Sequence, residues 1–191
     1  SKSAKYKVGD RVAAHMGWQT YIVADADDPR LMAVDLDNGS LSAHLGVVGM
    51  PGRTAYFGLS DVGKPVAGET LVVAAASGAV GSVVGQIAKL KGCTVIGSAG
   101  SDAKVALLTT ELGFDHAFNY NNGSILSHLK ALAPGGLDVY FDNVGAEHLQ
   151  AAIMSMRPFG RIALCGAIAT YNDTAPRPGP NNLSMAIGLG L

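Results

Sequence analysis

The sequence has little charge and no excess of charge of one sign. Charged residues make up 15% of its 191 residues, and 14 lysines and arginines nearly balance 15 aspartates and glutamates. The resulting net charge of -1 offers no electrostatic basis for binding nucleic acid or an anionic membrane. No apolar run reaches the roughly 18 residues of a membrane span, and the first residues lack a signal-peptide pattern. We therefore expect a cytoplasmic protein with neither nucleic acid nor membrane among its partners.

Cysteine is also scarce, which excludes a cysteine-rich zinc site. Cys93 and Cys165, the two cysteines, border strand-like segments that we do not expect to be neighbours in a sheet. We predict two buried thiols and no disulfide. The five histidines are scattered without the spacing of metal ligands, so we predict no metal site; they are His15, His44, His116, His128 and His148.

Apolar residues and glycine are abundant, as in a parallel sheet that is buried on both faces. From residue 71 onward, apolar runs of strand length alternate with segments of helical period. We predict strands at 71–75, 94–98, 116–119, 137–142 and 160–165, and helices near 79–91, 102–112, 123–132 and 145–156. Ser101 is a good N-cap, and Gly92 and Gly113 are good helix stops. The pattern predicts an α/β fold, a Rossmann-type doubly wound parallel sheet with strand order 3-2-1-4-5.

The turn between the first of these strands and its helix is the most informative stretch. Residues 76–81 read ASGAVG, a degenerate form of the glycine-rich dinucleotide fingerprint with Ala76 in place of the first glycine. Gly78 would let the backbone approach a pyrophosphate, and Gly81 would allow close packing of helix on strand. The phosphates would lie at the helix N-terminus, where free N–H groups and the helix dipole favour an anion.

The two ends of the chain differ from this regular part. Residues 5–36 predict a small antiparallel unit of three or four short strands, in which Trp18 packs. Residues 42–59 have a mainly helical pattern around a break at Met50-Pro51-Gly52. Because a dinucleotide fold usually has a sixth strand and this chain ends in the apolar stretch 186–191, we expect the sixth strand to be missing. The chain is therefore interpreted as a fragment of a longer protein.

The end of the second strand indicates which dinucleotide binds. NAD-dependent enzymes place an Asp or Glu there to bind the ribose hydroxyls. Residues 96–101 contain no acid, Lys104 can reach a 2′-phosphate, and Asp102 points elsewhere if Ser101 caps the helix. These residues favour NADP(H). The alternative for Lys104 is an ordinary solvated lysine in the first turn.

Six stretches spread over about two-thirds of the chain match one family in register. They are GMPGRTAYFGL (49–59), AAASGAVGSVVGQIAKLKGC (74–93), GSAGSDAK (97–104), ELGFDHAFNY (111–120), LDVYFDNVG (137–145) and GRIALCGAIATYN (160–172). On these stretches the chain resembles the zinc-independent prostaglandin reductase, leukotriene hydroxydehydrogenase and alkenal/curcumin reductase branch of the medium-chain dehydrogenase/reductase superfamily. The resemblance implies part of a GroES-like catalytic domain at 1–50 and an NADP-binding Rossmann domain at 51–191, truncated at its C-terminal end.

The resemblance also implies roles for individual residues. Gly78, Ala79, Val80 and Gly81 would bind pyrophosphate, Lys104 and Tyr120 would flank the adenosine phosphate, and Asn143 would contact the ribose or nicotinamide side. The loop after the fifth strand would line the nicotinamide; its residues are Cys165, Gly166, Ala167, Ile168, Ala169, Thr170 and Tyr171. Met50 and Thr54 are further candidates for the nicotinamide pocket, with packing and helix capping as the alternative reading.

The implied reaction is NADPH-dependent reduction of the carbon–carbon double bond of an α,β-unsaturated ketone or aldehyde. Hydride would go to the β-carbon, and a hydrogen-bond donor would be needed at the carbonyl oxygen, where negative charge develops. Residues 45–49 lack the cysteine that zinc-dependent relatives carry there, which leaves Tyr171 as the donor, by polarisation, orientation or proton delivery. The alternatives are an NADPH quinone reductase of the zeta-crystallin type and a non-catalytic NADP-binding module. A homodimer is expected for the full-length enzyme.

Overall fold

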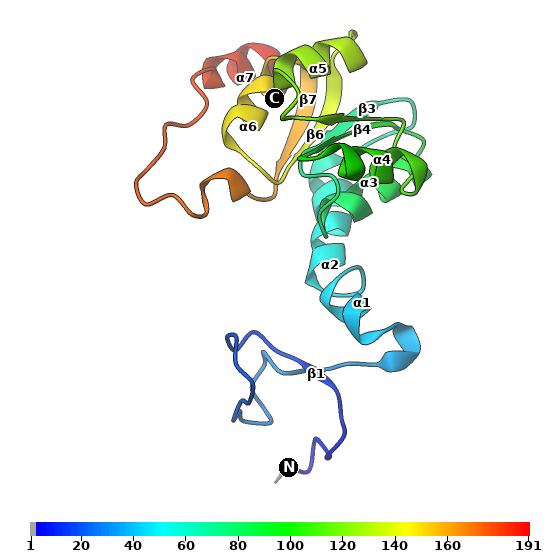
Figure 1. The fold of residues 1–191 in the computed structure, drawn as a ribbon, viewed down its shortest axis with the longest axis vertical. Helices are drawn as coiled ribbons and strands as arrows, with labels where there is room; N and C mark the ends of the chain where they lie inside the picture. Colours follow the sequence, from blue (N-terminus) through cyan, green and yellow to red (C-terminus); the bar gives the residue numbers. More distant parts are fainter. Residues whose placement is uncertain (1–2) are drawn as a thin grey trace. The chain divides into compact units, whose positions relative to one another are not determined.

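The computed structural model describes residues 3–191 and divides the chain into two units, one ending at Pro51 and the other beginning at Gly52 (Figure 1). In the first unit, β1 (Val12–Ala13) pairs antiparallel with β2 (Met32–Ala33), and η1 (Leu36–Asn38) and α1 (Leu41–Leu45) follow. The prediction that Trp18 packs in this unit is wrong, because its side chain is fully exposed. A ladder two residues long has no sheet face that could cover an indole. The assignment of this unit to a GroES-like domain stays a prediction.

The predicted helix break at Met50-Pro51-Gly52 is also wrong. These residues form the first turn of α2 (Met50–Phe57), where a proline interrupts no helical hydrogen bond. The interruption lies before them, between the end of α1 and Gly49, where a Cβ on Gly49 would overlap the carbonyl oxygen of His44. The π-helical turn η2 (Gly58–Gly63) continues directly from α2.

The second unit contains the predicted parallel sheet. Its strands are β3 (Thr70–Val73), β4 (Thr94–Ala99), β5 (His116–Asn119), β6 (Leu137–Asp142) and β7 (Met156–Leu164), in the order β5-β4-β3-β6-β7. This order is the predicted 3-2-1-4-5, and every neighbouring pair is parallel. Cys93 and Cys165 accordingly border strands separated by two others, and both thiols are free. Cys93 is buried as predicted, whereas Cys165 is only half-buried because it lies in the loop that follows the edge strand β7.

Helices cover both faces of this sheet (Figure 1). On one face, α3 (Gly81–Leu90), α4 (Asp102–Thr110) and η2 enclose a core that includes Val73, Val95 and Phe141. On the other, α5 (Ile125–Leu132), α6 (Ala146–Ile153) and α7 (Leu183–Leu189) enclose a core that includes Val72, Ile96 and Tyr140. Successive residues of a strand thus point into opposite cores, which explains why the strands are continuous apolar runs.

The fifth strand begins four residues earlier than predicted. Met156 pairs with Leu137, yet Arg161 already pairs with Val139, so the intervening residues of β7 form a bulge. Phe159 lies inside the bulge with a φ of 62°. Because a bulge interrupts the alternation of side chains, periodicity located only the part of the strand that follows it. The apolar end of the chain forms most of α7 and places Leu189 and Leu191 against the second core.

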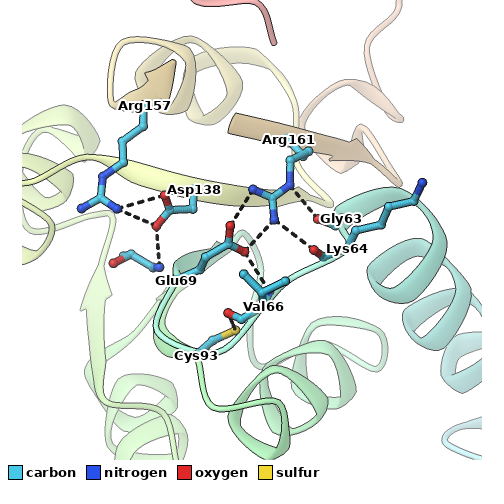
Figure 2. Close-up of polar contacts among 9 residues, drawn as sticks. Gly63, Lys64, Val66, Glu69, Cys93, Asp138, Arg157 and Arg161 are labelled. Atoms are coloured by element: carbon cyan, nitrogen blue, oxygen red, sulfur yellow. Dashed lines mark hydrogen bonds and ion pairs between the residues drawn. The ribbon is translucent and has the colours of Figure 1, made fainter. Parts of the chain in front are cut away.

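An ion-pair network fixes the amino ends of β3, β6 and β7 to one another (Figure 2). Arg161 donates to both carboxylate oxygens of Glu69, at 2.8 and 2.6 Å, and to the carbonyl oxygens of Gly63 and Lys64. The hydrogen bonds from Arg161 hold the pKa of Glu69 below its usual value, against the opposing effect of burial. Arg157 donates from Nη1 to both carboxylate oxygens of Asp138, each at 2.9 Å. These contacts lie at the end of the sheet opposite to the loops described next.

Candidate functional site

Four loops follow the carboxyl ends of β3, β4, β6 and β7 and lie at the same end of the sheet. They are residues 74–80 after β3, 100–101 after β4, 143–145 after β6 and 165–171 after β7. All the predicted site residues except Met50 and Thr54 lie in these loops, directly after β5 or in the first turns of α3 and α4. Open α/β sheets bind ligands outside this end, at the point where the strand order reverses. That point is here between β3 and β6.

The loop after β3 is tightly folded against the start of α3. Ala75 has a φ of 50°, and its carbonyl oxygen accepts a hydrogen bond from the Gly78 amide at 3.0 Å. A Cβ on Gly81 would lie 2.5 Å from that oxygen and 2.8 Å from the Cα of Ala76. Since both obstacles are backbone atoms, only glycine fits at position 81 without a shift of the turn. A Cβ on Gly78 would lie 3.2 Å from the same oxygen.

The N-terminus of α3 presents free backbone donors at this end of the sheet. The amides of Ser82, Val83 and Val84 are bonded to carbonyl oxygens of Gly78 and Val80. Within the described residues, the amides of Ala79, Val80 and Gly81 donate no such bond. Three unsatisfied N–H groups at the positive end of a ten-residue helix favour an anionic ligand.

The loop after β4 has no carboxylate free to face a ligand. The Ser101 hydroxyl caps α4 by accepting from the Lys104 amide at 3.4 Å. The Asp102 carboxylate accepts hydrogen bonds from the side-chain amides of Asn119 and Asn122, at 2.8 and 3.0 Å. Its Oδ1 is therefore engaged by the last residue of β5 and by the loop that follows it, while Lys104 is exposed in the first turn of α4.

The Asp142 carboxylate organises the loop after β6. It is buried, and its Oδ1 accepts from the amides of Val144 and Gly145 and from the Tyr140 hydroxyl, at 3.0, 2.9 and 3.1 Å. Burial, together with the Asp142 charge, raises the pKa of Tyr140 well above its usual value. Sequence reasoning assigned Asp142 no role. An acid that ends a buried strand and precedes Asn-Val-Gly is, however, a typical Asx-turn signal.

The loops after β6 and β7 are bonded to each other. The Asp142 carbonyl oxygen accepts from the amides of Cys165 and Gly166, and the Asn143 carbonyl oxygen accepts from the Ile168 amide. The side-chain amide of Asn143 donates to the carbonyl oxygen of Ala74 at 2.8 Å. Asn143 therefore joins three of the four loops. Its role toward a ligand stays a prediction.

Tyr171 ends the loop after β7, directly behind the short helix η3 (Ile168–Thr170). Its hydroxyl oxygen accepts from the Ala167 amide at 3.2 Å, which leaves the phenolic hydrogen as a donor. The side chain is 66% exposed, so this donor is accessible. At the start of the loop, burial raises the pKa of the Cys165 thiol, and the Asp142 charge adds to the effect. Cys165 is therefore not an activated nucleophile.

The remaining predicted residues, Met50 and Thr54, lie on α2. Met50 belongs to the first unit and Thr54 to the second, so their assignment to the same ligand pocket stays a prediction. Within residues 3–191, no group of three or more His, Cys, Asp or Glu side chains is placed to hold a metal ion. None of the helices in that range has the length and apolar character needed to cross a membrane.

Comparison with known proteins gives consistent matches. The family described as "Zinc-binding dehydrogenase" matches residues 79–185. Prostaglandin reductase 1 of Sus scrofa is 55% identical over 180 residues, which cover 93% of this chain and 54% of that protein. The NADP(+)-dependent 2-alkenal reductase of Nicotiana tabacum is 47% identical over 90% of this chain and 50% of its own length.

Bacterial proteins match as well. The NADPH-dependent curcumin reductase of Escherichia coli (strain K12) is 43% identical over 100% of this chain and 55% of its own length. Among solved structures, CurA from Vibrio vulnificus in complex with NADPH aligns with a TM-score of 0.86 and 43% identity, over 97% of this chain and 55% of CurA. The chain thus spans about half the length of the curated relatives it matches.

Proposed function

The chain belongs to the zinc-binding dehydrogenase family, and on that premise we propose that it is the cofactor-binding part of an NADPH-dependent reductase. The proposed substrates are α,β-unsaturated ketones and aldehydes, reduced at the carbon–carbon double bond without zinc. One observation carries the proposal. Relatives named for prostaglandin, alkenal and curcumin reduction share 43–55% identity with a chain whose four loops at the carboxyl ends of the strands contain the predicted site residues.

The turn after β3 fits the pyrophosphate of a dinucleotide. The free amides of Ala79, Val80 and Gly81 supply donors, and the absence of a side chain at Gly78 leaves room for close approach. With the pyrophosphate at this turn, we assign Asn143 to the ribose or nicotinamide side, because it follows β6, the strand next to β3 at the strand-order reversal.

The loop after β4 supports a preference for NADPH over NADH. An acid that binds the 2′-hydroxyl of NADH would repel a 2′-phosphate. Asp102, the nearest acid, is held by Asn119 and Asn122 instead. Lys104 is exposed one helical turn from the end of β4 and supplies the positive charge that a 2′-phosphate requires.

The chemistry then needs one donor at the carbonyl oxygen. When bound, NADPH supplies a hydride for the β-carbon of the substrate. The electron pair of the double bond moves toward the carbonyl oxygen, and protonation at the α-carbon completes the reduction. We assign to the Tyr171 hydroxyl the hydrogen bond to that oxygen. Because the Ala167 amide donates to the phenolic oxygen, the phenol is both oriented and polarised as a donor.

The proposal is tested in two steps. Calorimetric titration of this chain is expected to show NADPH binding that is tighter than NADH binding, and Lys104→Ala is expected to reduce NADPH affinity alone. The reductase that contains this sequence is then assayed by loss of the reduced-nicotinamide absorbance with an enone, an enal and a quinone. Turnover of the quinone alone would replace the proposal with a quinone reductase. Binding without turnover of any of the three would replace it with a non-catalytic NADP-binding module.

Two further properties of the whole protein belong to the same proposal. We place it in the cytoplasm, since both described cysteines are free thiols, as a reducing compartment maintains them. We also propose that it forms a homodimer, because β7 is an edge strand of the described sheet and an unpaired edge is a ready surface for a second chain. Sedimentation at several protein concentrations checks the dimer.

A further inference from the structure

Tyr120 follows β5 and lies between Gly100 and His148, two residues without a predicted role. A Cβ on Gly100 would lie 2.6 Å from the Tyr120 hydroxyl oxygen, so the phenol reaches across the loop after β4 where only glycine leaves room. On its other side, the Tyr120 ring meets the imidazole of His148 edge to face, with centroids 5.0 Å apart and planes at 82°. Tyr120 is thus held from β4 on one side and from α6 on the other.

His148 is an unfavourable residue for a core position, because burial of its polar ring destabilises the fold. It is 9% exposed, and its Nε2 is buried without a hydrogen-bond partner in the described part of the chain. Burial lowers the pKa of the imidazole, so the ring is neutral near pH 7. Leaving a buried polar atom unpaired destabilises a fold, and a leucine here would avoid that cost. A leucine would, however, lose the aromatic contact with Tyr120.

We infer that His148 is a positioning residue for cofactor selectivity: it holds the Tyr120 phenol across Gly100, beside the end of β4, where the 2′-phosphate of NADPH binds. This inference rests on the proposed function. The end of the second strand is where doubly wound folds distinguish the two dinucleotides. Tyr120 is 37% exposed, its hydroxyl oxygen lies over Gly100 in the loop after β4, and Lys104 is exposed in the first turn of the helix that follows this loop.

The mechanism is a restriction of rotation. Without the imidazole, the phenol has space to turn toward α6, and its hydroxyl leaves the loop after β4. The hydrogen bond to the 2′-phosphate is then lost, whereas NADH, which has no 2′-phosphate, loses nothing. Selectivity, rather than stability or general affinity, is therefore the property that reports on His148.

The test is calorimetric titration of this chain with NADPH and with NADH. For His148→Leu we expect NADPH affinity to fall about fivefold, which corresponds to about 1 kcal/mol, and NADH affinity to stay within about twofold. His148→Phe retains an aromatic ring and is expected to keep the preference for NADPH over NADH. The matched control is His128→Leu, which should leave both affinities unchanged. His128 also stacks on an aromatic ring, that of Phe118 with centroids 4.8 Å apart, and among the described residues it makes no ring contact with Tyr120.

Gly100→Ala provides a second route that leaves the packing of α6 intact. The added methyl group displaces the Tyr120 hydroxyl and is expected to reduce NADPH affinity without reducing NADH affinity. The inference is overturned if the ratio of NADPH affinity to NADH affinity is unchanged in both His148→Leu and Gly100→Ala. It is also overturned if His148→Phe loses as much NADPH affinity as His148→Leu. If the unchanged chain binds no NADPH, the proposed function fails and this inference fails with it.

Discussion

Gly81→Ala is the substitution whose effect the structure specifies best. The new methyl carbon would lie 2.5 Å from the carbonyl oxygen of Ala75, 2.8 Å from the Cα of Ala76 and 3.1 Å from the carbonyl carbon of Ala75. These atoms belong to the backbone of a turn in which Ala75 already has a φ of 50°. The methyl group cannot be accommodated by a rotamer change, so α3 must move away from the end of β3.

The size of the effect follows from two opposed contributions. Overpacking of this kind costs about 1–3 kcal/mol. Replacement of glycine by alanine in a helix returns about 0.5–1 kcal/mol in the interior and less at a first-turn position such as this one. We therefore expect the free energy of unfolding to fall by about 1–2 kcal/mol. NADPH affinity should fall as well, because the displaced helix carries the amides of Ala79, Val80 and Gly81.

Urea unfolding followed by circular dichroism measures the first effect, and calorimetric titration the second. Gly188→Ala is the matched control, since Gly188 also lies in a helix but a Cβ there would have nothing within 4 Å. It is expected to stabilise the chain slightly and leave NADPH affinity unchanged. If Gly81→Ala is as stable as Gly188→Ala, the reasoning from the close approach of α3 to the turn is refuted.

Three further changes test other contacts. Asp142→Ala should lower the free energy of unfolding, measured in urea, by about 2–4 kcal/mol, because it leaves two buried amides unpaired. Asp142→Asn keeps an oxygen acceptor and should lower it clearly less. Equal losses in the two variants would contradict this account. Arg161 lowers the pKa of Glu69 in the folded chain. The ion pair therefore contributes its full stabilisation above the unfolded-state pKa of about 4.5, and this stabilisation is lost as the pH falls from there through the lower folded-state pKa. Stability of the unchanged chain should therefore fall more steeply than that of Glu69→Gln in acid, and parallel pH profiles would count against the ion pair. Tyr171→Phe should lower turnover by the complete reductase and leave NADPH affinity nearly unchanged; a loss of binding would make Tyr171 a cofactor ligand instead.

Much of the sheet could be predicted because its strands are continuous apolar runs between polar residues. The predicted strands 116–119 and 137–142 agree with β5 and β6 residue for residue, helical crossovers predict the parallel sheet, and the usual order of a dinucleotide fold gives the strand order. The bulge in β7 was not predictable, since its cause is the pairing of Met156 with Leu137 rather than any local pattern. An aromatic residue in a β-rich run is typical of a core, but Trp18 lies in a unit whose described ladder is too short to bury it.

The candidate site shows the same division between local and distant contacts. The turn at 76–81 and the cap at Ser101 are local, and both were found from a few neighbouring residues. The contact of His148 with Tyr120 joins α6 to the end of β5. Because these residues are distant in the sequence, the spacing of the histidines does not predict it. Asp142 was within reach, because its partners lie at positions 140, 144 and 145.

The degenerate first position of the fingerprint has a structural explanation in a different strand. Ala76 is fully buried, and a Cβ on Gly97 of β4 would lie 2.8 Å from the Ala76 Cβ. The space for the Ala76 methyl group therefore comes from the absence of a side chain at Gly97. The same Cβ on Gly97 would lie 2.9 Å from Leu108 Cδ1 and 3.0 Å from Phe114 Cδ1, so glycine at position 97 leaves room for all three side chains. The first fingerprint position can therefore hold alanine because Gly97 on the neighbouring strand leaves room for its methyl group, which explains why a dinucleotide turn is compatible with ASGAVG and why the bare motif underestimates it.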